Sequence, residues 1–210
     1  MTPGSIPFRI RLGVTGHRVL AAPERTARSI RSILESRIGE LFDRPLAPER
    51  RTAVLAFTVL TPLAEGADRL VAKEALKRPG TEIEVALPLA REDYVRDFGT
   101  RASIEEFEAL CRKARHVYAL RTEPLPAAAP DDARAEEERK RAYEDVGRHV
   151  VDRSDVLIAV WDGRPSRGRG GTAEIVAYAR KKKRPLIIVS SEKPEHVILE
   201  KGSGLSGRGL

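Results

Sequence analysis

The sequence contains only one cysteine, Cys111, and four histidines. A single cysteine excludes an internal disulfide and suits a reducing compartment, so we expect a cytoplasmic protein. The histidines lie far apart and form no cluster of metal ligands, so we expect neither a metal nor another cofactor. Cys111 falls on the apolar face of a predicted helix, which indicates a small core residue rather than a nucleophile.

Long hydrophobic runs are absent as well. None approaches the ~18 apolar residues that a transmembrane helix needs, so we expect no membrane association. Arg9 and Arg11 interrupt the first apolar stretch, and charges at those positions are not typical of a signal peptide.

Aromatic residues make up only 5% of the chain, which leaves little surface for stacking single-stranded bases. The net charge is +7, from 38 basic and 31 acidic residues, and the basic residues are spread along the whole chain. The one dense basic run, 180–184, follows a predicted helix, where cations complement the negative helix end. These features argue against nucleic acid as a partner.

What the sequence does contain is a regular alternation of short apolar runs with amphipathic segments. The apolar runs predict strands at 8–14, 53–61, 82–87, 116–120, 156–161 and 185–189. Helices are predicted at 23–42, 67–78, 92–98, 103–114 and 133–153, and after residue 172. About six strands alternating with helices indicate an α/β protein with a Rossmann-like, doubly wound, mostly parallel sheet and helices on both faces.

The length of 210 residues fits one well-packed domain, which we place at residues 1–191. Residues 192–210 end in a Gly/Ser-rich stretch and are expected to form a flexible tail. The Pro/Ala-rich segment 122–132 is expected to form a mobile loop.

Three predicted loops follow strands and combine glycine with polar or charged residues: 15–18, 65–68 and 162–174. Ligands of doubly wound sheets bind outside the carboxyl ends of the strands, so we expect these loops to converge on one site. The expected ligand-binding residues are Thr15, Gly16, His17, Arg18, Glu65, Gly66, Asp68, Asp162, Gly170, Gly171 and Thr172.

The stretch from 155 to 179 gives the clearest local pattern, a buried strand, a basic Gly-rich loop and a helix. This arrangement presents free backbone N–H groups and a helix N-terminus to an anion. Gly170 and Gly171 permit close backbone approach, and Thr172 can cap the helix or donate to a phosphate oxygen. Glu174 falls in the first helical turn and is expected to face the same crevice. Glu174 can also act only on the helix dipole, and Asp68 can bind a ribose hydroxyl or simply cap its helix.

Three pieces of the chain, GVTGHR (13–18), AEGAD (64–68) and GRGGTAE (168–174), resemble the SLOG branch of Rossmann-like proteins. This branch joins the LOG phosphoribohydrolases, the DNA-processing protein DprA and sensor domains of bacterial defence systems. The resemblance implies a bacterial, stand-alone SLOG-type domain that binds a nucleotide-derived ligand such as an ADP-ribose relative. It also implies a homodimer.

The chain departs from the LOG pattern PGGxGTxxE, in which a glutamate three residues after the threonine is catalytic. Here Ile175 stands three residues after Thr172, and Glu174 stands two after it. One position turns a helical side chain by about 100°. Three functions remain open: a binding module that senses the ligand without turnover, an N-glycosidase that uses Glu174, and DprA-like DNA binding, which the charge and aromatic content favour least.

Overall fold

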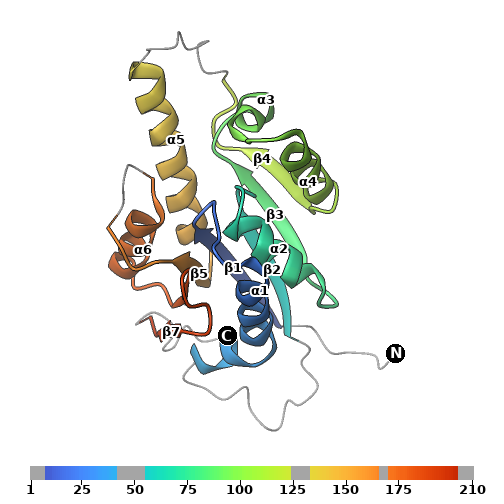
Figure 1. The fold of residues 1–210 in the computed structure, drawn as a ribbon, viewed down its shortest axis with the longest axis vertical. Coiled ribbons are helices and arrows are strands. Elements are labelled where there is room, and N and C mark those ends of the chain that lie inside the picture. Colours follow the sequence, from blue (N-terminus) through green and yellow to red (C-terminus); the bar gives the residue numbers. More distant parts are fainter. Residues whose placement is uncertain (1–7, 42–54, 124–132, 166–169, 203–210) are drawn as a thin grey trace.

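The computed structural model describes residues 8–41, 55–123, 133–165 and 170–202. They form a sheet of seven strands in the order β4-β3-β2-β1-β5-β6-β7 (Figure 1). The strands are β1 (Phe8–Gly16), β2 (Leu55–Thr61), β3 (Glu82–Leu87), β4 (His116–Ala119), β5 (Val156–Trp161), β6 (Leu186–Ser190) and β7 (Val197–Glu200). All neighbouring pairs are parallel except β6 and β7. The expected α/β class with a doubly wound, mostly parallel sheet is confirmed.

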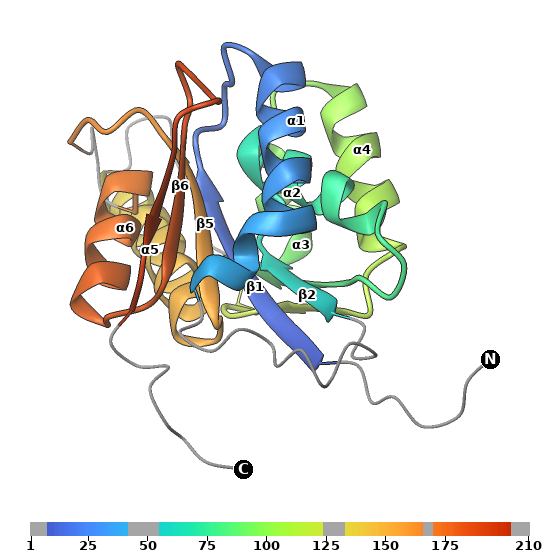
Figure 2. The ribbon, with the colours of Figure 1, turned by 90° about the horizontal axis from the view of Figure 1, so that it is seen from below.

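The helices pack on both faces of the sheet (Figure 2). They are α1 (Pro23–Ser32), α2 (Ala67–Leu76), α3 (Arg91–Tyr94), α4 (Arg101–Cys111), α5 (Ala133–Asp152) and α6 (Thr172–Lys181). The first four cover one face, whereas α5 and α6 cover the other. Each face buries its own apolar cluster, with Phe57 and Phe107 in the first and Val150 and Ile175 in the second. Both faces of β5 and β6 are therefore covered, which explains their continuous apolar sequences.

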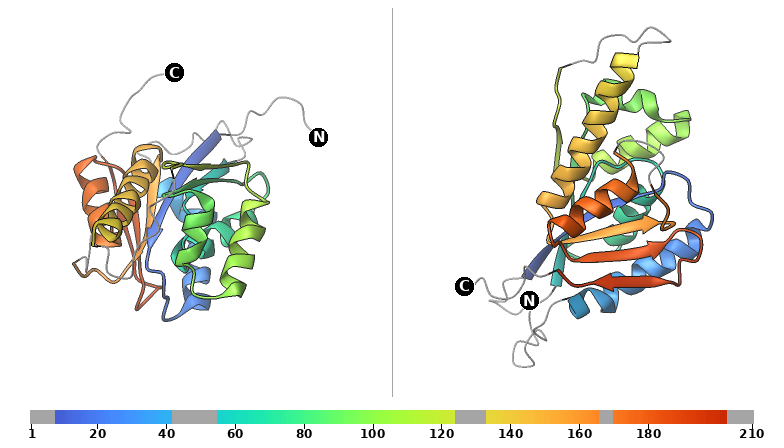
Figure 3. Two further views of the ribbon diagram at one scale, coloured as in Figure 1. Left: turned by 90° about the horizontal axis from the view of Figure 1, so that it is seen from above. Right: turned by 90° about the vertical axis from the view of Figure 1, so that its left-hand side faces the viewer.

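The long helix α5 connects the edge strand β4 back to β5 in the middle of the sheet. Its N-terminal end projects beyond the sheet, whereas its C-terminal half lies against it (Figure 3). The apolar residues Val146, Val150 and Val151 are buried on the side that faces the sheet. Among the described residues, no helix is both long enough and apolar enough to span a membrane.

The C-terminal part of the chain differs from the prediction. A flexible tail was expected from residue 192, but 197–200 form β7, which pairs antiparallel with β6. The structured part of the chain therefore extends past 191, and 203–210 lie outside the described residues. Most of the loop predicted at 122–132 also lies outside them.

Two helix boundaries differ as well. The helix expected to continue to 42 changes after Ser32 into a π-helical turn, Ile33–Arg37, and a 3-10 turn, Ile38–Leu41. The helix expected to start at Ser103 begins earlier, because the side chain of Thr100 accepts a hydrogen bond from the Ser103 N–H and caps α4. Residues 95–97 form a further 3-10 turn after α3.

Candidate ligand-binding cleft

A cleft of about 680 Å³ opens at the carboxyl ends of β1 and β5. These strands are neighbours, but the helices that follow them, α1 and α6, pack on opposite faces of the sheet. Such a switch point leaves a crevice between the diverging loops. The volume falls within the range of ~300–1,000 Å³ that small-molecule sites occupy.

The end of β1 forms the floor of the cleft. The His17 N–H donates to the carbonyl oxygen of Val160 (3.1 Å), which holds the loop against β5. A Cβ atom on Gly16 would lie 2.5 Å from the Cβ of Ala67 and 2.8 Å from that carbonyl oxygen. Only glycine therefore allows β1, β5 and α2 to meet this closely at the cleft.

Arg18 follows on the same loop and lines the cleft. Its guanidinium carbon lies 5.2 Å from the centroid of the Tyr143 ring, on α5. The Tyr143 hydroxyl donates to Asp97, which also accepts from Arg139 Nη1 (2.6 Å). Burial alone would lower the pKa of Arg18, but Tyr143, Tyr94 and Asp97 together raise it. The cleft thus contains a permanent positive charge that is held by stacking, and no ion pair to Arg18 occurs among the described residues.

His17 and Asp162 meet on one side of the cleft. The Nε2 atom of His17 lies 3.3 Å from Asp162 Oδ1 and 3.2 Å from the backbone nitrogen of Asp162. His17 Nε2 accepts a hydrogen bond from the Asp162 N–H when it carries no hydrogen, and it donates to the Asp162 carboxylate when it carries one. A hydrogen bond from the Arg164 N–H, together with the neighbouring His17, lowers the pKa of Asp162. Asp162 is therefore anionic at neutral pH.

The N-terminus of α6 forms a further wall, where Gly170, Gly171, Thr172 and Ala173 line the cleft. Thr172 does not cap the helix as one alternative held; Gly171 is the N-cap, and no side chain caps it. The first N–H groups of a helix have no partner within the helix, and its dipole is positive at this end. This wall can accept an anion.

Glu174 does not face the crevice as expected. Its Oε2 accepts a hydrogen bond from the Gly170 N–H (2.6 Å), so the carboxylate turns back onto the start of its own helix. Glu174 is exposed and is not part of the cleft lining. The local contact explains its position, since a carboxylate near a helix N-terminus satisfies an otherwise unpaired donor.

Asp68 contributes a buried carboxyl group to the cleft. It lies in the first turn of α2, only 4% of its surface is exposed, and its Oδ2 accepts from the Ala64 N–H (3.2 Å). Burial raises the pKa of Asp68 to about 7, although hydrogen bonds from Ala64 and Thr61 and the charges of Arg18 and Arg69 oppose this shift. Asp68 therefore changes its charge near neutral pH.

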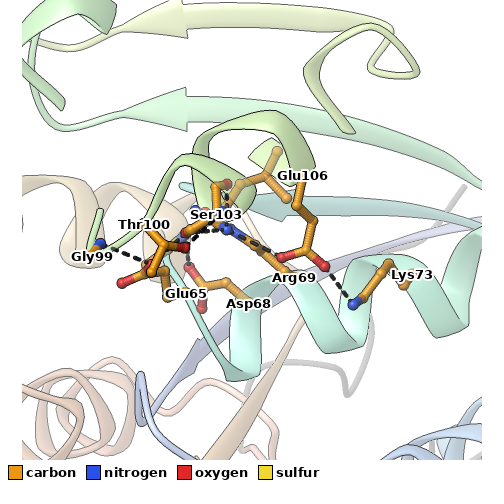
Figure 4. A network of polar contacts seen from close by, with 10 residues as sticks. Glu65, Asp68, Arg69, Lys73, Gly99, Thr100, Ser103 and Glu106 are labelled. Carbon is orange, nitrogen blue, oxygen red and sulfur yellow. Dashed lines mark hydrogen bonds and ion pairs between the residues drawn. The ribbon is translucent and has the colours of Figure 1, made fainter. Parts of the chain in front are cut away.

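The structure places Glu65 and Gly66 outside the cleft lining, although sequence analysis grouped them with Asp68. Glu65 points toward α4, where it accepts from the Gly99 N–H (3.3 Å) and from the Ser103 hydroxyl (Figure 4). The same network contains Arg69, which donates to Ser103 and Glu106. Its contacts join α2 to α4, so the role of Glu65 here is structural.

Several cleft residues were not predicted as ligand contacts. Among them are residues of α5 and of the end of β5: Lys140, Tyr143, Val146, Gly147, Val150, Trp161 and Arg164. Val146 and Val150 on α5 are both buried core residues and part of the cleft lining. Gly147 was the sequence feature that could have pointed to α5 as part of the cleft. A Cβ atom at this position would lie 2.4 Å from Ile175 Cδ1, so glycine lets α5 approach α6. The described residues contain no group of three or more His, Cys, Asp or Glu that could hold a metal ion.

Comparisons with known proteins concern the fold. No protein-family model and no curated protein matches the chain. Among solved structures, the chain is similar to DNA processing protein A (DprA) from Streptococcus pneumoniae, with 14% sequence identity and a TM-score of 0.48. The match covers 85% of this chain and 50% of that protein, so the chain spans about half of its length. At this identity the similarity concerns the fold alone.

Proposed function

We propose that the cleft binds a nucleotide or nucleotide-derived ligand, such as an ADP-ribose relative, and that the protein acts as a sensor or effector of that ligand. The observation that carries this proposal is the convergence of Arg18 and the uncapped N-terminus of α6 on one cleft. A fixed cation and a helix N-terminus that line one cleft are suited to a phosphate or pyrophosphate group.

The remaining cleft surface suits the rest of such a ligand. Tyr143, Val146 and Trp161 provide flat or apolar surface for a base. Asp68 provides a carboxyl group for ribose hydroxyls, whereas Glu65 faces α4 instead. This division of the cleft supports a ligand that combines anionic, hydroxyl and aromatic parts.

The position of Glu174 favours binding over cleavage of an N-glycosidic bond. A glycosidase needs a carboxyl group beside the reacting sugar carbon, and the Glu174 carboxylate is bound to Gly170 N–H at the start of α6. We therefore expect saturable binding without release of the base, and we expect Glu174→Gln to retain that binding.

The direct test is isothermal titration calorimetry with AMP, ADP, NAD and ADP-ribose, combined with chromatography of each mixture to detect released base. We expect at least one compound to bind. Arg18→Ala should then weaken binding by roughly tenfold or more, because a charge-assisted hydrogen bond contributes about 1.5–3 kcal/mol.

Arg28→Ala is the matched control, since Arg28 is an exposed arginine on α1 that does not line the cleft. It should leave the affinity unchanged. The proposal fails if no compound binds, or if both arginine variants weaken binding equally. Base release that disappears in Glu174→Gln would replace the sensor function with a hydrolase.

A further inference from the structure

The charge of Asp68 is not neutralised by an ion pair. No salt bridge to Asp68 occurs among the described residues, and its hydrogen bonds come from the neutral groups of Ala64 and Thr61. The adjacent Arg69 donates instead to the Leu63 carbonyl oxygen (2.9 Å) and to Ser103, and its guanidinium carbon lies 4.4 Å from the Phe98 ring centroid. A buried carboxylate in this position is costly, and protonation removes that cost.

The other groups that act on Asp68 come from α3 and from the loop after β1. Tyr94 on α3 is fully buried, its hydroxyl has no hydrogen-bond partner among the described residues, and Asp68 contributes to raising its pKa. Arg18 is the cation that acts on Asp68 from the cleft side, and it favours the ionised form. Tyr143 contacts Arg18 and is kept neutral by burial and by Asp97, which raise its pKa.

Arg18 is therefore shared between two anionic groups once a phosphate enters. Arg18 and Asp68 both line the cleft, as does the N-terminus of α6. When the phosphate binds Arg18, it screens the positive charge that favours ionised Asp68 and adds a negative charge to the same cleft. Both effects favour the protonated form of Asp68.

We infer that the cleft takes up one proton together with its anionic ligand, and that the Asp68 carboxyl group holds this proton. The inference rests on the proposed function, because it requires an anion in the cleft. By linkage, binding strengthens as the pH falls through neutrality and weakens at alkaline pH. This pH dependence of binding comes from the protein alone when the ligand has no group that titrates in this range.

ADP-ribose is the suitable probe, because its pyrophosphate diester carries no group that titrates near pH 7. Calorimetry at pH 6, 7 and 8 should show the Kd rising up to about tenfold per pH unit above neutrality. Repeating each titration in buffers of different ionisation enthalpy should show net proton uptake by the complex at pH 7 and 8, and little at pH 6, where Asp68 is already mostly protonated. In Asp68→Asn, which keeps the shape and the acceptor oxygen, both effects should disappear.

His17 is the histidine that lines the cleft, so His17→Gln is the matched variant. It should retain the proton uptake whatever its effect on affinity. Uptake that persists in Asp68→Asn, or that disappears in His17→Gln, would overturn the inference while leaving the proposed function intact. Failure of ADP-ribose and the other nucleotides to bind at all would instead refute the proposed function.

A second measurement does not depend on whether the variant folds. Carboxyl ¹³C NMR of the wild-type protein should show one buried aspartate whose titration moves to higher pH when ADP-ribose is added. An unchanged midpoint for that aspartate on saturation with ligand would contradict proton uptake at Asp68.

Discussion

Gly66 allows α2 to begin directly against the loop that carries Arg18. Its backbone angles, φ 80° and ψ −116°, are essentially restricted to glycine. A Cβ atom there would lie 2.2 Å from the carbonyl oxygen of Arg18, and a backbone atom cannot rotate away. This close approach joins the start of α2 to the loop after β1.

We expect Gly66→Ala to lower the free energy of unfolding by roughly 2–4 kcal/mol, because the strained backbone costs about 1–3 kcal/mol and the clash adds to it. Gly80→Ala is the control: φ is 75° there, but the nearest atom to the new Cβ is 3.9 Å away, so only ~1 kcal/mol should be lost. Urea denaturation measures both values. Equal losses would show that the contact with Arg18 is unimportant.

Asp68 also makes stability depend on pH. Its pKa is about 7 in the folded protein against 3.8 for an ordinary aspartate, so the folded state binds the proton more tightly. The stabilisation that this proton gives is complete below the pKa of Asp68 in the unfolded chain, and it is lost as the pH rises through the pKa of Asp68 in the folded protein. The wild-type protein should therefore lose stability as the pH rises from roughly 4 to 7, whereas Asp68→Asn has no carboxyl group to titrate. The unfolding free energy of Asp68→Asn relative to wild type should rise by up to ~1.4 kcal/mol per pH unit over this range. Denaturation curves across that range would contradict the assignment if the difference were constant.

Residue type and spacing predicted which loops meet, but not the direction of each side chain. Thr15, His17, Arg18 and Asp68 all line the cleft as expected. The two glutamates do not, because each finds a nearer donor, at Ser103 for Glu65 and at Gly170 for Glu174. Such local competition depends on tertiary neighbours that a single sequence does not reveal.

At the scale of elements, β7 shows what periodicity misses. Only four residues long, it forms because β6 offers an unpaired edge, with Val189 opposite Val197 and Ile187 opposite Leu199. Short segments whose structure depends on a partner strand carry too weak a pattern to be recognised. The buried strand β5, by contrast, was predicted with its observed bounds, because its apolar run is uninterrupted.

The two faces of β7 differ, and this gives a matched pair of substitutions. Leu199 packs on the main core cluster, whereas the side chain of Ile198 is 57% exposed. We expect Leu199→Ala to lower the free energy of unfolding by roughly 1–2 kcal/mol, less than for a fully buried leucine. Ile198→Ala should change it by no more than about 0.5 kcal/mol. If thermal and urea unfolding show no difference between the two variants, β7 does not pack in solution as described.

At the scale of the whole molecule, the alternation of strands and helices was enough to predict the class. It did not give the order of the strands. The chain leaves β4 at one edge and returns through α5 to place β5 beside β1, and it is this return that creates the cleft. Long-range pairing of this kind leaves no mark on local hydrophobic patterns, so it follows only from the three-dimensional structure.

The central position of β1 has a consequence for biosynthesis. Leu12 pairs with Val59 on one side and with Val156 on the other. A ribosome that adds about 5–20 residues per second delivers the second partner several seconds after the first. Until then the growing chain presents an apolar strand with an open edge, the kind of surface that chaperones protect and that otherwise aggregates. The emergence of β5 closes that edge of β1, but β5 then presents an open edge of its own until β6 pairs with it. The cleft is complete only when the start of α6 and residues 191 and 192 have followed.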